Sequence, residues 1–188
     1  TAGAINFDRY EVKFEIDEKG KPISVYFKES KDANKLVEEF MLLANRTVAE
    51  KIGKAPKGKK PKVLPYRIHD LPDPEKLDNL AQFIARFGYR LRTSGTKTDV
   101  SKSINHLLDD IQGKKEENLI ETVSIRAMQK ARYSTHNIGH YGLAFDYYTH
   151  FTSPIRRFPD MMVHRLVTRY MDGGRSGSET KYEDLCDH

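Results

Sequence analysis

Apolar and polar residues alternate along the first part of the chain. Over residues 7–17 every second residue is apolar from Tyr10 onward, and the alternation returns from Ile23 to Phe27. A period of two is typical of β-strands, because successive side chains point to opposite faces of a sheet. The turn residues Glu18-Lys19-Gly20 separate the two runs, so the pattern predicts a β-hairpin.

Beyond residue 31 the apolar positions recur at intervals of three and four residues. This spacing places them on one face of a helix, and capping residues or an Asp-Pro pair mark several of the starts. The predicted helices run from Asp32 to about Lys51, from Asp73 to Gly88, from Asp99 or Ser101 to near Gly113, and over residues 116–132.

Residues 140–151 are rich in aromatic side chains and predict a strand or a pair of strands. We expect this segment to join the hairpin in one antiparallel or mixed sheet that about five helices cover, which makes the predicted fold class α+β. The aromatic rings are candidates for stacking on nucleic-acid bases. Aromatic side chains in a strand usually bury well, so most of these rings are expected in the core.

The fifth predicted helix starts in the segment Thr-Ser-Pro-Ile-Arg-Arg-Phe-Pro-Asp, residues 152–160. Ser153 fits an N-cap followed by proline, and Pro159 allows a second start. The free N–H groups of a helix start attract anions, and the planar guanidinium groups of Arg156 and Arg157 suit a phosphate. The alternative is an ordinary helix start with solvated arginines.

The sequence HYGLAFDYYTHFTSPIRRFPDMMVHRLV, residues 140–167, resembles the closing signature of the ribonuclease II/ribonuclease R family, the RNB-type 3′-to-5′ exoribonucleases. Two further blocks resemble the same family in the same order, over residues 2–52 and residues 66–91. The YRIHDLPDPEK block and the Arg-Arg-Phe-Pro-Asp sequence are more similar to the bacterial ribonuclease R branch than to the ribonuclease II branch.

The resemblance implies that residues 1–172 are the C-terminal part of an RNB catalytic domain and that residues 173–188 are a linker toward a following domain. It implies processive hydrolysis of RNA from the 3′ end to nucleoside monophosphates with Mg²⁺. In this family the metal-binding aspartates lie upstream of the hairpin, so the chain, which starts at Thr1 without a methionine, is interpreted as a fragment. We expect no metal site within it and no appreciable activity of this stretch alone.

The same resemblance assigns the catalytic role to Arg156, whose charge would neutralise the charge that builds on the scissile phosphate. Thr152, Ser153 and Arg157 are predicted to bind nucleic acid, the first two as donors to phosphate oxygens. For Arg157 the alternative is pairing with a carboxylate. His164 and the arginine after it are interpreted as part of a structural polar network rather than as catalysts.

Positive charge is concentrated in one further segment. The chain has a net charge of +5, and residues 51–70 carry seven basic residues and one acidic residue. Proline and glycine punctuate this segment, which predicts a loop. Lys57, Lys59 and Lys60 are therefore predicted to attract RNA phosphates independently of base sequence. The alternative is a solvated surface loop.

Composition limits the other possibilities. Cys186 is the single cysteine, which excludes a disulfide within the chain and is compatible with a reducing cytosol. No apolar run approaches the length of a membrane helix. We expect a cytoplasmic monomer that binds the 3′ end of single-stranded RNA and no membrane. Two other classes stay open, a non-catalytic single-stranded RNA-binding module and an interaction domain whose basic loop is incidental.

Overall fold

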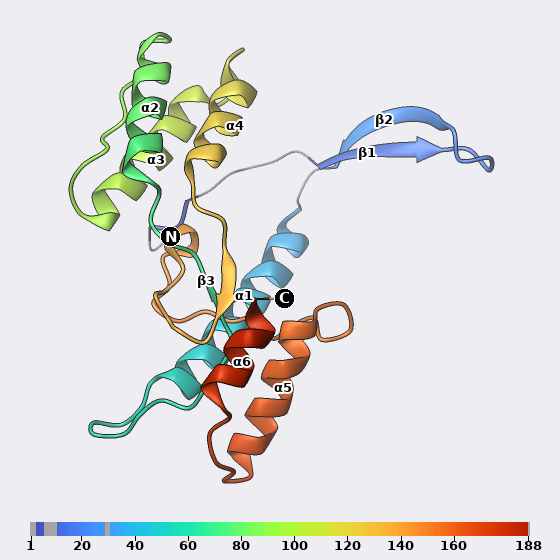
Figure 1. Ribbon diagram of the computed structural model, residues 1–188. Coiled ribbons are helices and arrows are strands. Elements are labelled where there is room, and N and C mark those ends of the chain that lie inside the picture. The colour runs from blue at the N-terminus through green and yellow to red at the C-terminus, as the bar shows by residue number, and fades with distance from the viewer. Residues whose placement is uncertain (1–2, 6–10, 29–30, 188) are drawn as a thin grey trace.

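The computed structural model describes residues 3–5, 11–28 and 31–187, and these contain six α-helices and two separate two-stranded sheets (Figure 1). The α+β fold class is confirmed. In chain order the elements are β1 (Glu11–Ile16), β2 (Pro22–Lys28), α1 (Asp32–Gly53), β3 (Tyr66–Ile68), α2 (Pro74–Ala85), α3 (Lys97–Ile111), α4 (Glu117–Ala127), β4 (Arg132–Ser134), the 3-10 helix η1 (Tyr141–Leu143), α5 (Phe158–Met171) and α6 (Glu179–Cys186).

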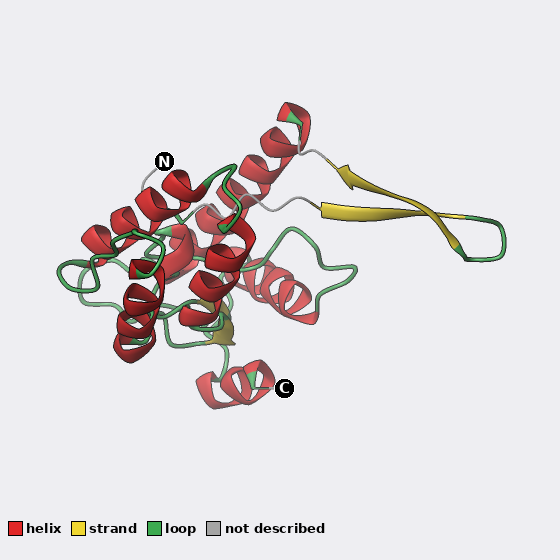
Figure 2. Cartoon of the chain, turned by 90° about the horizontal axis from the view of Figure 1, so that it is seen from above, coloured by secondary structure: helices red, strands yellow, loops and turns green. Residues whose placement is uncertain are grey.

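The predicted hairpin is confirmed where the structure describes it, and the predicted strand residues 7–10 lie outside the described residues. Strands β1 and β2 pair antiparallel, with Phe14 opposite Val25. The carboxylate of Asp17 accepts from the N–H groups of Lys19 and Lys21 at 2.9 and 2.8 Å and so closes the turn. The hairpin projects away from the helices (Figure 2), and both Phe14 and Val25 are exposed.

The predicted sheet that joins residues 140–151 to the hairpin is wrong. Strand β3 pairs instead with β4, and residues 140–151 contain η1 and irregular backbone with isolated bridges. The backbone explains the difference, because Gly139 and Ala144 adopt positive φ angles of 81° and 53°. A left-handed residue interrupts an extended strand, whatever the aromatic content around it.

The buried apolar residues of the described helices and of β3 form two hydrophobic cores. The first lies between α2, α3 and α4 and includes Leu80, Ile104 and Ile120. The second joins α1, β3 and α5 through Ala49, Ile68 and Val163, among others. Phe151, in the segment before α5, packs against this second core, which α1, β3 and α5 form without a large sheet.

Several predicted helix boundaries need correction. The N-cap of α2 is Asp73 as predicted, and its side chain accepts from the N–H of Glu75 at 2.9 Å. Helix α3 begins before the predicted start, because Thr96 and Asp99 form a capping box. Helix α4 ends at Ala127 and not near residue 132, since residues 132–134 form β4.

The predicted N-cap at Ser153 is wrong, and the second predicted start, near Pro159, is the one that the chain uses. Residues 153–157 form a turn, and α5 begins at Phe158 with Pro159 in its first turn. A helix running through both segments would lose the N–H of Pro159, and the proline ring would clash with the carbonyl four residues earlier. The helix therefore starts beside this proline.

Helix α6 forms within the segment that was interpreted as a linker. Ser178 caps it, and Glu183 accepts a hydrogen bond from Ser134 Oγ at 2.6 Å and further bonds from Thr135. These contacts attach α6 to β4. No helix of the described part of the chain is both long and apolar enough to span a membrane.

Candidate nucleic-acid interface

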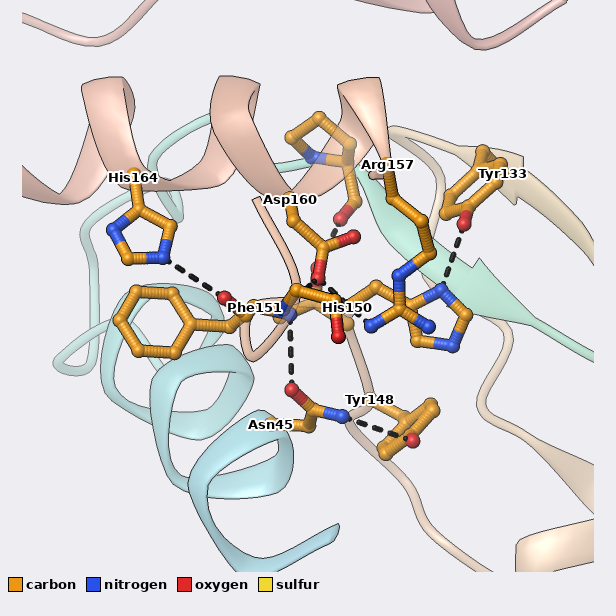
Figure 3. A network of polar contacts seen from close by, with 11 residues as sticks. Asn45, Tyr133, Tyr148, His150, Phe151, Arg157, Asp160 and His164 are labelled. Atoms are coloured by element: carbon orange, nitrogen blue, oxygen red, sulfur yellow. Dashed lines mark hydrogen bonds and ion pairs between the residues drawn. The ribbon is translucent and has the colours of Figure 1, made fainter. Parts of the chain in front are cut away.

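A buried carboxylate holds the turn that precedes α5. The N–H groups of Arg156 and Arg157 donate to the carbonyl oxygen of Ser153 at 3.3 and 3.1 Å, which closes the turn. The N–H of Ser153 donates to Oδ1 of Asp160 at 2.8 Å, and Asp160 is fully buried in the first turn of α5. Asp160 therefore fixes the start of the turn from inside the molecule (Figure 3).

The same carboxylate binds Arg157. Nη2 of Arg157 donates to Oδ1 of Asp160 at 2.8 Å, and the arginine side chain is 23% exposed. Among the described residues, Arg157 Nε and Asp160 Oδ2 are buried without a hydrogen-bond partner. Of the two interpretations of Arg157, pairing with a carboxylate is the one that the structure supports. A role in nucleic-acid binding stays a prediction.

Arg156 differs from its neighbour. It is exposed, and its side chain forms no hydrogen bond or ion pair with any described residue. Ile155, beside it, is fully exposed, while Thr152 and Ser153 are half-buried. The backbone of the turn is fixed by hydrogen bonds within the chain, while the guanidinium of Arg156 is exposed to solvent. An exposed guanidinium on a fixed backbone is suited to binding the phosphate of a ligand.

His150 lies next to the turn and stays neutral near pH 7. Its Nδ1 is 2.7 Å from the hydroxyl oxygen of Tyr133 on β4. Burial, and then the positive charge of Arg157, lowers the pKa of His150 to about 4. Burial also raises the pKa of Tyr133. This hydrogen bond between two neutral groups was not predicted from the sequence.

Asn45 ties α1 to the segment that leads into the turn. It is 3% exposed, and its Nδ2 donates to the Tyr148 hydroxyl at 3.1 Å while its Oδ1 accepts from the N–H of Phe151 at 2.9 Å. These two bonds make Asn45 a support of the segment that leads into the turn.

His164 has the structural role that was predicted. Its Nε2 is 2.8 Å from the carbonyl oxygen of Phe151, and its ring stacks on the Phe151 ring with centroids 4.0 Å apart. Arg165 is exposed and takes no part in this network. The aromatic run before the turn is mainly structural as expected, with Tyr141 and Tyr148 buried.

The three candidate lysines of the basic loop are exposed. The side chains of Lys57, Lys59 and Lys60 form no hydrogen bond or ion pair with any described residue, whereas the Nζ of Lys62 donates to the carbonyl oxygen of Gly174 at 3.2 Å. In this loop Lys62 is therefore bonded to the chain, whereas the side chains of Lys57, Lys59 and Lys60 extend into solvent.

The structure does not bring these lysines to the Arg156 turn. A cavity of about 290 Å³ is lined by the loop together with Tyr170 and Met171, at the C-terminal end of α5. Arg156 precedes the N-terminal end of the same helix. The 14 residues of α5 span roughly 21 Å at 1.5 Å per residue, which separates the two basic elements (Figure 1).

Comparisons with known proteins identify the family of this chain. The RNB domain family matches residues 1–173. The chain belongs to the RNB family. Ribonuclease R of Aquifex aeolicus is 40% identical to this RNB chain over 183 residues, which cover 96% of the chain and 24% of the relative. The chain thus spans about a quarter of the length of that curated relative.

Solved structures agree with this assignment. Mycoplasma genitalium RNase R in complex with ribose-methylated single-stranded RNA has a TM-score of 0.76 and 28% identity, over 89% of this chain and 25% of the other. Yeast Ssd1, described as a pseudonuclease, has a TM-score of 0.68 and 25% identity, over 85% of this chain and 19% of the other. The predicted family, and its ribonuclease R branch, are confirmed.

The RNB chain offers no metal cluster among the residues that the structure describes. No three His, Cys, Asp or Glu side chains in those ranges come together in a way that could hold a metal ion. Asp109 and Asp110 are exposed on α3, and Asp110 lies 2.8 Å from Nδ1 of His106. The described residues therefore do not fit the magnesium that the resemblance implies.

Proposed function

We propose that this chain is the C-terminal part of the catalytic domain of a ribonuclease R-like 3′-to-5′ exoribonuclease. The full-length enzyme would hydrolyse single-stranded RNA from its 3′ end and release nucleoside monophosphates. The observation that carries this proposal is the pair of adjacent arginines before α5, of which Arg157 is held by Asp160 and Arg156 is exposed without a side-chain bond to any described residue.

Arg156 is the proposed catalytic residue of this part of the domain. Its guanidinium would stabilise the negative charge that grows on the scissile phosphate and its leaving oxygen. Such a group accelerates the reaction only if it is already positioned when the charge develops. The bonds from Ser153 to Asp160 and across the turn supply that positioning, since they fix the backbone that carries Arg156.

The magnesium that the resemblance implies has no ligands among the described residues, so no reaction step is assigned to it here. We propose that its ligands come from elsewhere in the full-length enzyme. The contribution of this chain is then to bind the RNA strand and to hold a positive charge at the reacting phosphate.

Lys57, Lys59 and Lys60 are proposed to attract the RNA backbone outside the reacting site. Their distance from Arg156 along α5 means that they would contact a different part of the strand. Thr152 and Ser153 are proposed as donors to phosphate oxygens near the turn. We also propose that the enzyme acts as a monomer in the cytoplasm.

A second candidate function follows from the similarity to yeast Ssd1. A pseudonuclease keeps the RNB fold without the nuclease reaction, so this chain could belong to a non-catalytic RNA-binding protein. The free Arg156 favours the enzyme, because binding alone does not require a braced cation at this turn. The two functions make different predictions for the full-length protein.

The deciding experiment incubates the full-length protein with Mg²⁺ and a single-stranded RNA labelled at its 5′ end. An exoribonuclease releases nucleoside monophosphates and shortens the labelled strand from the 3′ end. Binding of the RNA without release of any mononucleotide would favour the pseudonuclease. EDTA in a parallel sample controls for contamination by a metal-independent nuclease.

A further inference from the structure

Arg67 on β3 is a partly buried cation to which no function has yet been given. It lies opposite Tyr133 in the pairing of β3 with β4, and its Cζ is 4.7 Å from the centroid of the Tyr133 ring. Arg67 forms no ion pair with any residue in the described ranges. Its charge is therefore not balanced by a contacting carboxylate there.

Arg67 is linked to the Arg156 turn through the rings between them. Tyr133, which the Arg67 guanidinium overlies, is hydrogen-bonded through its hydroxyl to His150 at 2.7 Å. The backbone N–H of Arg67 donates to the carbonyl oxygen of Tyr148 at 3.0 Å, and the Tyr148 and His150 rings meet edge to face. Figure 3 shows these rings beside Arg157 and Asp160.

Positive charge exceeds negative charge around these rings. Burial is the largest cause of the lowered pKa of His150, and the positive charges of Arg157, Arg67 and Arg156 lower this pKa further. The carboxylate of Asp160 has the opposite effect and raises the pKa. His150 is neutral near pH 7, so among the charges that act most strongly on it, three guanidinium groups are opposed by one carboxylate. An excess of this kind, next to partly buried rings, is stabilised by an anion from outside.

We propose that Arg67 binds a second backbone phosphate of the RNA strand whose reacting phosphate meets Arg156, an inference that rests on the proposed function. The ring of Tyr133 supports the guanidinium from one side and restricts its motion. The N–H donors lie in the plane of the guanidinium and stay free to form a forked pair with a phosphate. Tyr133 is then a positioning residue for Arg67.

The test measures binding of a fluorescein-labelled oligouridine to the full-length protein without divalent metal, over a range of salt concentrations. Arg67→Met removes the charge and keeps a long side chain, and we expect the log–log salt slope to fall by about 0.7. Arg67→Lys keeps the charge and should keep most of the slope. The matched control is Arg132→Met, which removes one exposed charge from β4 on the opposite face to Tyr133.

An unchanged slope for Arg67→Met overturns the proposal, whether or not the variant unfolds at a lower temperature. If Arg67→Met lowers the melting temperature but leaves the salt slope unchanged, the role of Arg67 is to support Tyr133 and not to bind phosphate. An equal loss of slope in Arg132→Met would reduce the effect to net charge and would also overturn the proposal.

Failure of the proposed function gives a different result. If the wild-type protein releases no mononucleotides with Mg²⁺ but Arg67→Met still lowers the slope, then Arg67 binds RNA phosphate in a non-catalytic protein. If the wild-type protein is active and Arg67→Met keeps the wild-type salt slope, the proposed nuclease function is supported and the proposed phosphate site at Arg67 is wrong.

Discussion

Arg157 and Asp160 form a partly buried ion pair at 2.8 Å that closes the base of the turn carrying Arg156. The carboxylate also accepts from the N–H of Ser153, so one buried oxygen holds both ends of the turn. The two adjacent arginines are therefore not equivalent. Arg157 belongs to the support of the turn, and Arg156 is available to a ligand.

Asp160→Ala is expected to destabilise the fold by about 3–5 kcal/mol, because it leaves the charge of Arg157 without its partner and the N–H of Ser153 without an acceptor. Urea unfolding of the purified chain measures the change. Asp160→Asn keeps an acceptor for Ser153 and should cost less. A loss below about 0.5 kcal/mol for Asp160→Ala, the range of ordinary surface substitutions, would show that the pair does not hold the turn.

Stability should fall as the pH is lowered from about 6.5 toward 4. The folded state depresses the pKa of His150 from 6.5 to about 4, so in this window the unfolded chain binds a proton that the folded chain resists. Above pH 6.5 the group is neutral in both states and contributes no pH dependence. His140, whose pKa burial lowers to about 3, adds to the same trend.

Urea midpoints at pH 7 and pH 5 test this prediction. His150→Asn removes the titrating group, so the difference between the two midpoints should be smaller in the variant than in the wild type. His106, which is exposed on α3, supplies the control substitution His106→Asn. Equal differences in the wild type and His150→Asn would contradict the assignment of the pH dependence to His150.

Replacement of Lys57, Lys59 and Lys60 by Ala should weaken RNA binding similarly for all base sequences. Each lost phosphate contact lowers the log–log salt slope by about 0.7 for a single strand. Fluorescence anisotropy with two RNAs of unrelated sequence gives the slope. Lys62→Ala is the control, since Lys62 is anchored to Gly174. If the triple variant keeps the wild-type slope, the loop is a solvated surface.

This chain alone should release no mononucleotides from single-stranded RNA, even with Mg²⁺. The reason is that its described residues offer no cluster of metal ligands. Incubation of the purified chain with labelled RNA and Mg²⁺, beside the full-length protein as a positive control, checks the expectation. Mononucleotide release that EDTA abolishes would place a metal site within this chain.

Helices α1 to α5 and the hairpin could be predicted because their signals are local, whereas α6 lies in the segment that was interpreted as a linker. Apolar spacing and the Asp73 cap lie within each segment itself. The pairing of β3 with β4 joins segments far apart in the sequence, and each strand has only three residues, too few to show a period. The aromatic residues of 140–151 predicted a strand because aromatic side chains are common in strands. Aromatic content does not indicate the left-handed backbone at Ala144.

The sequence predicted a helix start in the segment that carries Arg156, but it showed neither the turn at residues 153–157 nor the contacts that support it. The order Ser-Pro-Ile-Arg-Arg can be read directly from the sequence. Asp160 follows Arg157 by three residues, a spacing at which side chains at the start of a helix can meet. Asn45 gave a weaker signal as a polar residue on an apolar helix face. The contact of Tyr133 with His150, and of Arg67 with Tyr133, depends on tertiary pairing and had no sequence signal.

The most direct test of the central claim is single-turnover degradation of a 3′ single-stranded RNA by full-length Arg156→Ala, beside equilibrium RNA binding without metal. Loss of a group that acts in the transition state costs on the order of 100- to 1000-fold in rate, whereas a long RNA keeps most of its phosphate contacts. We expect the rate of Arg156→Ala to fall by that order with little loss of affinity, and Arg156→Lys to restore little of the rate, since an ammonium lacks the planar fork. An intact rate, or an affinity that falls as far as the rate, would contradict the catalytic role of Arg156.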